Sequence, residues 1–240
     1  MLVFVARAYD WNVRSRFLLW LLLAGCTNSP HSLAFLANRQ LLLIADFDPP
    51  SPQPPAIAAF LQFDLPSGSC PTLSISADLD GVLFADAPNG TGRTASGCQL
   101  AYYLTTSPPP AADESTLRFS DASGVAFLSG TRILERRALA ASVPNAATIH
   151  AGDVIDFVWS TETDTVTSVG GAFISGSTKQ DVSADVTGTT AHVVVPPLGA
   201  GDWQLSMSAL ADAAITNCTG AAACSVQVSG RGSVAVTISP

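Results

Sequence analysis

Four cysteines in the body of the chain have side chains and spacing suited to covalent chemistry. Cys70 and Cys98 form one neighbouring pair, and Cys218 and Cys224 form a second. An even number of cysteines in an exported chain predicts disulfide bonds, and of the three possible connectivities proximity favours these two pairs. The alternative is a four-cysteine zinc site, but Cys-x-x-Cys spacing is absent and the pairs lie far apart. We therefore expect two local disulfides, one in each of two lobes.

A fifth cysteine, Cys26, follows a segment with the features of a signal peptide. Arg14 and Arg16 precede an uninterrupted apolar run over residues 17–24. The run is too short to span a bilayer, which takes about 20 residues, but it has the length of the apolar region of a secretory leader. It ends in Leu23-Ala24-Gly25-Cys26, and this order of features resembles the lipobox of bacterial lipoproteins.

The lipobox resemblance implies that a diacylglycerol is attached to the Cys26 sulfur, that residues 1–25 are removed, and that the new amino terminus is acylated. Bacterial lipoproteins without an aspartate after the cysteine usually continue to the outer membrane, and Thr27 occupies that position. The bilayer is therefore the expected partner of Cys26, and the bacterial envelope the expected location. The alternative is a secretory leader or buried helix with a chance cysteine.

The chain after this leader is acidic and rich in small residues. Without residues 1–25 it carries 8 basic and 18 acidic residues. Such a charge repels phosphate backbones and argues against nucleic acid as a partner. Short apolar runs with β-branched residues, broken by Gly, Pro and Asp, are typical of β-sandwiches rather than helical proteins. The length suits one large or two small domains.

The histidines give little support for catalysis. His31 lies in a predicted tether, His150 precedes a Gly-Asp turn, and His192 precedes a strand at Val193–Val195. Nucleophilic catalysis needs a base beside the nucleophile, and the chain has neither a Gly-x-Ser-x-Gly elbow nor a His-Glu-x-x-His motif. We therefore predict no catalytic residue and no cofactor. A hydrolase would require His150 or His192 to meet an acid and a serine between the lobes.

The carboxylates have two interpretations each. Asp78-x-Asp80-Gly81 resembles part of a calcium loop, but the third ligand and the final Glu of an EF-hand are missing, and an Asp-Gly hairpin turn explains the same residues. Glu162 with Asp164, and the stretch from Asp181 to Asp185, could gather at a sandwich end and bind calcium weakly, or keep loops solvated. We predict no metal site.

Three arginines form the only basic cluster, at the predicted boundary between the lobes: Arg132, Arg136 and Arg137. They could bind an anionic partner. A solvated linker is the simpler interpretation.

Turn residues and apolar runs divide the chain after the leader into a tether and two lobes. Residues 26–56 are the predicted lipidated cysteine and tether, because Asp48 to Pro55 is proline-rich and should be extended. Leu41-Leu42-Leu43-Ile44 interrupts the tether and would add a strand or a helical turn to the first lobe. The predicted lobes are residues 57–136 and 137–240.

In the first lobe, the pattern predicts a hairpin over residues 73–84 that turns at Asp80-Gly81. Further predicted strands are residues 99–105, 116–119, 124–128 and 131–134. We expect a small β-sandwich.

The second lobe alternates clearly between apolar and polar residues. Ile155, Phe157 and Trp159 share one face. A second strand alternates from Trp203 through Met207. Two sheets packed face to face satisfy both patterns, with both tryptophans in the core.

Two segments of the second lobe resemble immunoglobulin-like domains. Gly152 to Trp159 is similar to strand B with a core tryptophan, and Leu198 to Trp203 is similar to the turn into strand F, with its corner aromatic at Trp203. The disulfide that joins strands B and F in antibody domains is absent. The resemblance covers about 100 residues and implies an immunoglobulin-like lobe.

These patterns predict a lipid-anchored, non-catalytic binding or structural module of the cell envelope, with an envelope protein or glycan as partner. A calcium- or carbohydrate-binding adhesin is the alternative, and it needs an acidic loop cluster or an exposed aromatic platform. A hydrolase with a site between the lobes is the third possibility.

Overall fold

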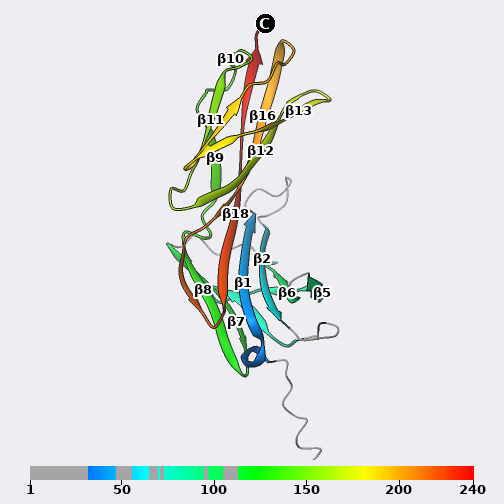
Figure 1. The fold of residues 1–240 in the computed structure, drawn as a ribbon, viewed down its shortest axis with the longest axis vertical. Coiled ribbons are helices and arrows are strands. Elements are labelled where there is room, and N and C mark those ends of the chain that lie inside the picture. Colours follow the sequence, from blue (N-terminus) through cyan, green and yellow to red (C-terminus); the bar gives the residue numbers. More distant parts are fainter. Residues whose placement is uncertain (1–31, 47–55, 65–69, 71–72, 95–96, 105–112) are drawn as a thin grey trace, which may run out of the picture.

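The chain folds into two β-sandwich lobes that lie end to end along one long axis (Figure 1). The fold is all-β, as predicted, with one short 3-10 turn. The computed structural model describes residues 32–46, 56–64, 70, 73–94, 97–104 and 113–240. The predicted leader, Cys26, His31 and the proline-rich stretch lie outside the described residues. Among the described residues, no helix is long and apolar enough to cross a membrane.

Lobe 1 packs two sheets against each other. One has the strand order β18-β1-β2-β6-β5 and the other β17-β8-β7-β3-β4. The elements are η1 (Leu33–Phe35), β1 (Ala37–Asp46), β2 (Ala56–Asp64), β3 (Ser76–Leu79), β4 (Val82–Leu83), β5 (Ala85–Thr94), β6 (Gly97–Tyr103), β7 (Glu114–Asp121), β8 (Gly124–Thr131), β17 (Ile215–Thr219) and the first half of β18 (Ala223–Ile238).

Lobe 2 has the strand pairing of an immunoglobulin-like sandwich. The strands β14-β15-β11-β9 form one layer, and β10-β18-β16-β12-β13 form the other, with β10 parallel to β18. A short parallel pairing of β9 with β18, at Arg137 and Ala138, makes the two layers continuous. These sheets correspond to the D-E-B-A and A′-G-F-C-C′ sheets of that fold. Besides the second half of β18, the strands are β9 (Arg137–Ala141), β10 (Ala147–Ile149), β11 (Val154–Trp159), β12 (Thr165–Ser175), β13 (Thr178–Ser183), β14 (Asp185–Thr187), β15 (Thr190–Val194) and β16 (Gly201–Asp212).

Part of the predicted tether belongs to the core of lobe 1. β1 contains the apolar run, and it lies between β2, which is antiparallel to it, and β18, which is parallel. Leu41 and Leu43 are fully buried. The run is therefore a strand and not a helical turn, and residues 32–46 are not a tether. Both neighbours of β1 come from later in the chain, so local sequence could not reveal its burial.

The two lobes are interleaved along the chain, which differs from the predicted division at residue 136. In the sequence, β17 follows most of the strands of lobe 2, but it lies in lobe 1, where it pairs with β8. β18 then starts beside β1 and continues into lobe 2. The chain therefore passes between the lobes three times: at residues 132–136, at residues 213–214 and within β18.

β18 makes the sheet continuous across both lobes. At residues 227–229 it pairs with β1 of lobe 1 on one edge and with β16 of lobe 2 on the other. The Ser229 hydroxyl also donates a hydrogen bond to Asp46 at 2.6 Å. Backbone ladders on both sides resist bending at this point, so the two lobes are joined by sheet and not by a flexible linker.

Both predicted disulfide bonds are present, but their predicted distribution is wrong. Cys70–Cys98 and Cys218–Cys224 have Cα–Cα distances of 5.6 and 5.9 Å. Both lie in lobe 1, because Cys218 lies opposite Leu128 of β8 and Cys224 lies opposite Leu41 of β1. The Cys218–Cys224 bond lies in lobe 1 because β17, which contains Cys218, pairs with β8 of that lobe.

The predicted core of lobe 2 is confirmed for β11. Ile155 and Phe157 are fully inaccessible, and Trp159 is 1% exposed. Trp203 is only half-buried and packs at the edge of the core, because it lies near the start of β16, at the open end of the sandwich.

In lobe 1, the predicted strand at residues 131–134 is instead the end of β8 followed by a turn.

Candidate functional site

The Asp-Gly motif of lobe 1 is a hairpin turn, as the simpler interpretation predicted. Asp80 and Gly81 have φ angles of 51° and 82°, the left-handed values of a tight two-residue turn between β3 and β4. The Asp80 carboxylate accepts a hydrogen bond from Thr116 N at 2.7 Å, and the Asp78 carboxylate accepts one from Gly81 N at 3.1 Å. Backbone groups therefore occupy these oxygens. Within the described residues, no group of three His, Cys, Asp or Glu side chains could hold a metal ion.

The two histidines of lobe 2 each lie beside an aspartate on the surface. His192 Nδ1 is 2.7 Å from Asp156 Oδ1, across the β11–β15 pair. His150 Nδ1 is 3.7 Å from Asp153, and both side chains are at least half exposed. In the described part of the chain, no hydroxyl or thiol group is hydrogen-bonded to the other ring nitrogen of either histidine. Neither residue lies between the lobes, where the hydrolase hypothesis needed it.

The predicted arginine cluster is dispersed, and Arg137 is at the centre of a buried group. Its side chain is fully buried, as is that of Asp164, and Arg137 Nε is 2.8 Å from Asp164 Oδ2. Arg137 Nη2 donates to the second carboxylate oxygen at 3.1 Å. Trp159 Nε1 donates to the same carboxylate at 2.9 Å. We call Arg137, Asp164 and Trp159 the junction cluster.

The junction cluster fixes the first passage of the chain between the lobes. Arg137 Nη1 donates to the carbonyl oxygens of Arg132 and Glu135, which lie between β8 and β9. Gly230 of β18 packs so closely that a Cβ there would lie 2.9 Å from Arg137 Cβ and 3.0 Å from the Trp159 ring. Arg137 is therefore a structural cation and not an anion-binding residue. Asp164, predicted as a loop carboxylate, is its buried partner.

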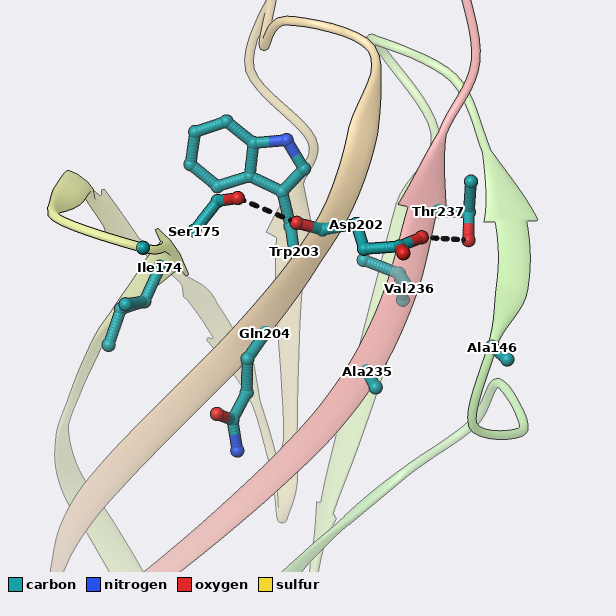
Figure 2. A pocket seen from close by; sticks show the side chains of 10 residues that line it. Ala146, Ile174, Ser175, Asp202, Trp203, Gln204, Ala235, Val236 and Thr237 are labelled. Atoms are coloured by element: carbon teal, nitrogen blue, oxygen red, sulfur yellow. Dashed lines mark hydrogen bonds between the residues drawn. The ribbon is translucent and has the colours of Figure 1, made fainter.

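An open groove of about 580 Å³ lies at the far end of lobe 2, across β12, β16 and β18. We call it the distal groove. Figure 2 shows that residues from these strands line it: Ile174, Ser175, Asp202, Trp203, Gln204 and Thr237.

Hydrogen bonds fix the orientation of the polar side chains in the distal groove. Thr237 Oγ1 donates to Asp202 Oδ1 at 2.8 Å, and Ser175 Oγ donates to the Asp202 carbonyl at 2.8 Å (Figure 2). Trp203 Nε1 donates to the Gly199 carbonyl at 2.9 Å, in the manner of the corner aromatic of immunoglobulin-like domains. Among the described residues, no lysine or arginine lines the groove, and Asp202 supplies its formal charge. The groove therefore suits a neutral or cationic ligand that exchanges hydrogen bonds.

Trp203 was predicted as a core residue, and its neighbours in the groove were not predicted as site residues. The alternation along β16 was visible in the sequence and places Asp202 and Gln204 on the face opposite Leu205. The contribution of Thr237 was not visible, because β16 and β18 meet through pairing of residues 35 positions apart, Asp202 with Thr237. The Arg137–Asp164 pair was not visible either, because the two residues are 27 positions apart and charged side chains are usually exposed.

No protein-family model and no curated protein sequence matches the chain. Among solved structures, a tandem pair of titin immunoglobulin domains matches at 9% identity, with 85% of this chain and 94% of that chain covered and a TM-score of 0.24. The tandem immunoglobulin repeats of Dlar match at 9% identity, covering 81% of this chain and 96% of that chain, with a TM-score of 0.23. Murine CEACAM1b matches at 10% identity, covering 83% and 100%, with a TM-score of 0.19. Such low TM-scores carry no functional argument, and the immunoglobulin-like assignment of lobe 2 rests on its strand pairing.

Proposed function

We propose that the protein is a lipid-anchored module of the bacterial envelope, at the outer membrane, that displays a non-catalytic binding surface at a fixed distance from the bilayer. The lipobox at Cys26 supports the anchor. Within the described part of the chain, the histidine–aspartate pairs have no hydroxyl or thiol group hydrogen-bonded to the imidazole, which supports a non-catalytic role. The distal groove is the proposed binding surface, and an envelope protein or glycan is the proposed partner.

The observation that carries the proposal is the continuity of β18. Its residues 223–238 belong to both lobes, and at about 3.3 Å per residue the strand is about 50 Å long. Because the first half of β18 belongs to lobe 1 and the second half to lobe 2, this strand holds the distal groove at the end of the molecule opposite the start of the described chain. A flexible pair of domains would not need three chain passages or a buried ion pair at the junction.

The lining of the distal groove favours a glycan as one class of partner. A carboxylate, an amide and two hydroxyl groups line the groove, from Asp202, Gln204, Ser175 and Thr237, whereas the Trp203 side chain packs against the core on the other face of β16. Groups that accept and donate hydrogen bonds at a surface groove suit a hydroxylated ligand such as a sugar. This observation keeps the carbohydrate-binding alternative open, whereas the carboxylates of the Asp-Gly turn do not support the calcium-binding one.

Photo-crosslinking in intact cells tests the binding surface. A photoreactive residue at Gln204, in the groove, should yield a specific adduct. The same residue at Asp185, which is exposed on β14 in the other sheet of lobe 2, is the matched control and should yield none. Equal yields at both positions, or no adduct at Gln204, would contradict a partner at the groove. Intact-mass measurement of protein extracted from membranes tests the anchor separately.

A further inference from the structure

The end of lobe 1 that lies farthest from lobe 2 is where the described chain begins. η1 lies at this end, while the C terminus lies at the opposite tip of lobe 2 (Figure 1). Leu33 N donates to Asp121 Oδ2 at 2.6 Å, and Ala34 N donates to Ser123 Oγ at 3.0 Å. Asp121 and Ser123 belong to the turn between β7 and β8. We call η1 with this turn the base.

The base is held firmly to the lobe. Leu33 and Leu36 are 1% and 4% exposed and belong to the hydrophobic core. Burial alone would raise the pKa of Asp121, but hydrogen bonds from Leu33 and from Ser123 and Gly124 outweigh it, so its pKa is lowered. The charged carboxylate is therefore the form that holds η1.

Only a short stretch of chain separates the base from Cys26. Residues 27–31 lie between Cys26 and Ser32, where the described chain starts. Six Cα–Cα steps span at most about 20 Å even at full extension. Any lipid on Cys26 thus keeps the base within about 20 Å of the bilayer surface, less than half the length of β18.

An apolar side chain projects from the base into solvent. Phe35 is 62% exposed although its neighbours Leu33 and Leu36 are buried. Val125, two residues beyond Ser123, is 51% exposed. Single exposed apolar residues are ordinary on a protein surface. These two lie on the part of the surface that the anchor would bring closest to lipid.

We propose that the base is a second membrane contact, in which Phe35 and Val125 enter the headgroup region of the bilayer beside the acylated Cys26. The inference rests on the proposed lipid anchor. The acyl chains supply the affinity, whereas the apolar contact of the base sets the orientation. Lobe 1 then contacts the membrane and the long axis of the molecule points away from it, so the distal groove lies at the end farthest from the bilayer.

Quenching by brominated lipids tests this orientation. The lipidated full-length protein is reconstituted into phosphatidylcholine vesicles with bromine on the acyl chains. A Phe35→Trp variant adds an indole at the base, and Val154→Trp adds one at a position of lobe 2 that is 54% exposed. Both sites are on the surface, so both variants should fold. The emission added by Phe35→Trp should be lost in brominated vesicles, and that added by Val154→Trp should be retained.

The outcomes separate the inference from the proposed function. Lipid on Cys26 with an unquenched Phe35→Trp variant overturns the membrane contact and leaves the anchor intact. Equal quenching of both variants also overturns it, because the molecule would then lie along the bilayer. Absence of lipid on Cys26 in membrane-extracted protein, seen by intact mass, contradicts the proposed function and the orientation that rests on it.

Discussion

The two lobes have similar architecture but are stabilised by different means. Lobe 1 holds both disulfide bonds, and lobe 2 contains no cysteine. Lobe 2 instead has a buried ion pair, Arg137 with Asp164, whose carboxylate also accepts a hydrogen bond from Trp159. Covalent bonds restrict the unfolded chain, whereas the ion pair is favourable only when every member is satisfied in the folded state.

This difference shows where the molecule depends on precise packing. The junction cluster lies at the lobe 2 side of the junction and contacts the chain passage from lobe 1. Because β18 also crosses there, a defect at the junction should propagate to both lobes. The disulfides, in contrast, should stabilise lobe 2 only through the shared strand. The comparison predicts a single cooperative unit with two different kinds of support.

Removing the buried cation should have the largest effect. Arg137→Met leaves Asp164 buried without its partner, and such a loss typically costs about 3–5 kcal/mol of unfolding free energy. Lys179→Met is the matched control, because Lys179 and Asp181 form an exposed pair on β13, for which a loss of less than about 1 kcal/mol is expected. Urea denaturation measures both. Equal stabilities for the two variants would show that the junction cluster has no special role.

Removing the longer disulfide should follow closely. The Cys70→Ser/Cys98→Ser variant frees a loop with a sequence separation of 28 residues, and the chain-entropy estimate is about 3–4 kcal/mol. The Cys218→Ser/Cys224→Ser variant opens a separation of 6 residues and should lose about 2–3 kcal/mol. If the lobes are coupled, tryptophan emission from lobe 2 should report these losses as well. An unchanged lobe 2 midpoint would mean that the lobes unfold independently.

Crowding the junction should have a smaller effect. Gly230→Ala places a Cβ against Arg137 and Trp159 and should cost about 1–3 kcal/mol, the usual range for overpacking. Gly170→Ala on β12 meets nothing within 4 Å and serves as the control. Thermal unfolding should separate the two variants. Similar melting temperatures would indicate that the contact between β18 and the junction cluster can relax.

The base should respond to acid without much effect on the rest of the molecule. Because the pKa of Asp121 is lowered in the folded state, its contribution is present above the unfolded value of about 3.9 and is lost as the pH falls through the lower folded value. The protection factors of the Leu33 and Ala34 amides against hydrogen exchange, which correct for the intrinsic pH dependence of exchange, should therefore fall in that acidic range. An Asp121→Asn variant should show low protection factors at every pH. Wild-type protection factors that stay constant through this range would remove Asp121 as the cause.

The sequence predicted what depends on local pattern. Alternation placed Ile155 and Phe157 correctly, the Asp-Gly pair predicted the β3–β4 turn, and proximity predicted both cysteine pairs. It failed where partners are distant in the chain. The return of β17 to lobe 1, the burial of β1 and the pairing of Arg137 with Asp164 all depend on contacts that no local periodicity records.

The distal groove shows the same limit. Trp203 was predicted as core because its parity along the strand matches that of Leu205 and Met207. Alternation shows which face of the sheet a residue occupies, but not how far the residue lies from the end of the strand. The partly exposed position of Trp203 at the open end of the sandwich was therefore missed. Asp202 and Thr237 become neighbours only once β16 and β18 are paired.

Equilibrium unfolding followed by two intrinsic probes tests the central claim, that the two lobes form one unit. After residue 25 the only tyrosines are Tyr102 and Tyr103, both in lobe 1, and the only tryptophans are Trp159 and Trp203, both in lobe 2. In protein that starts at residue 26, tyrosine and tryptophan emission therefore report the two lobes separately without any introduced probe. If the lobes unfold together, both probes should show the same urea midpoint, as in two-state unfolding. Two separated transitions would contradict it.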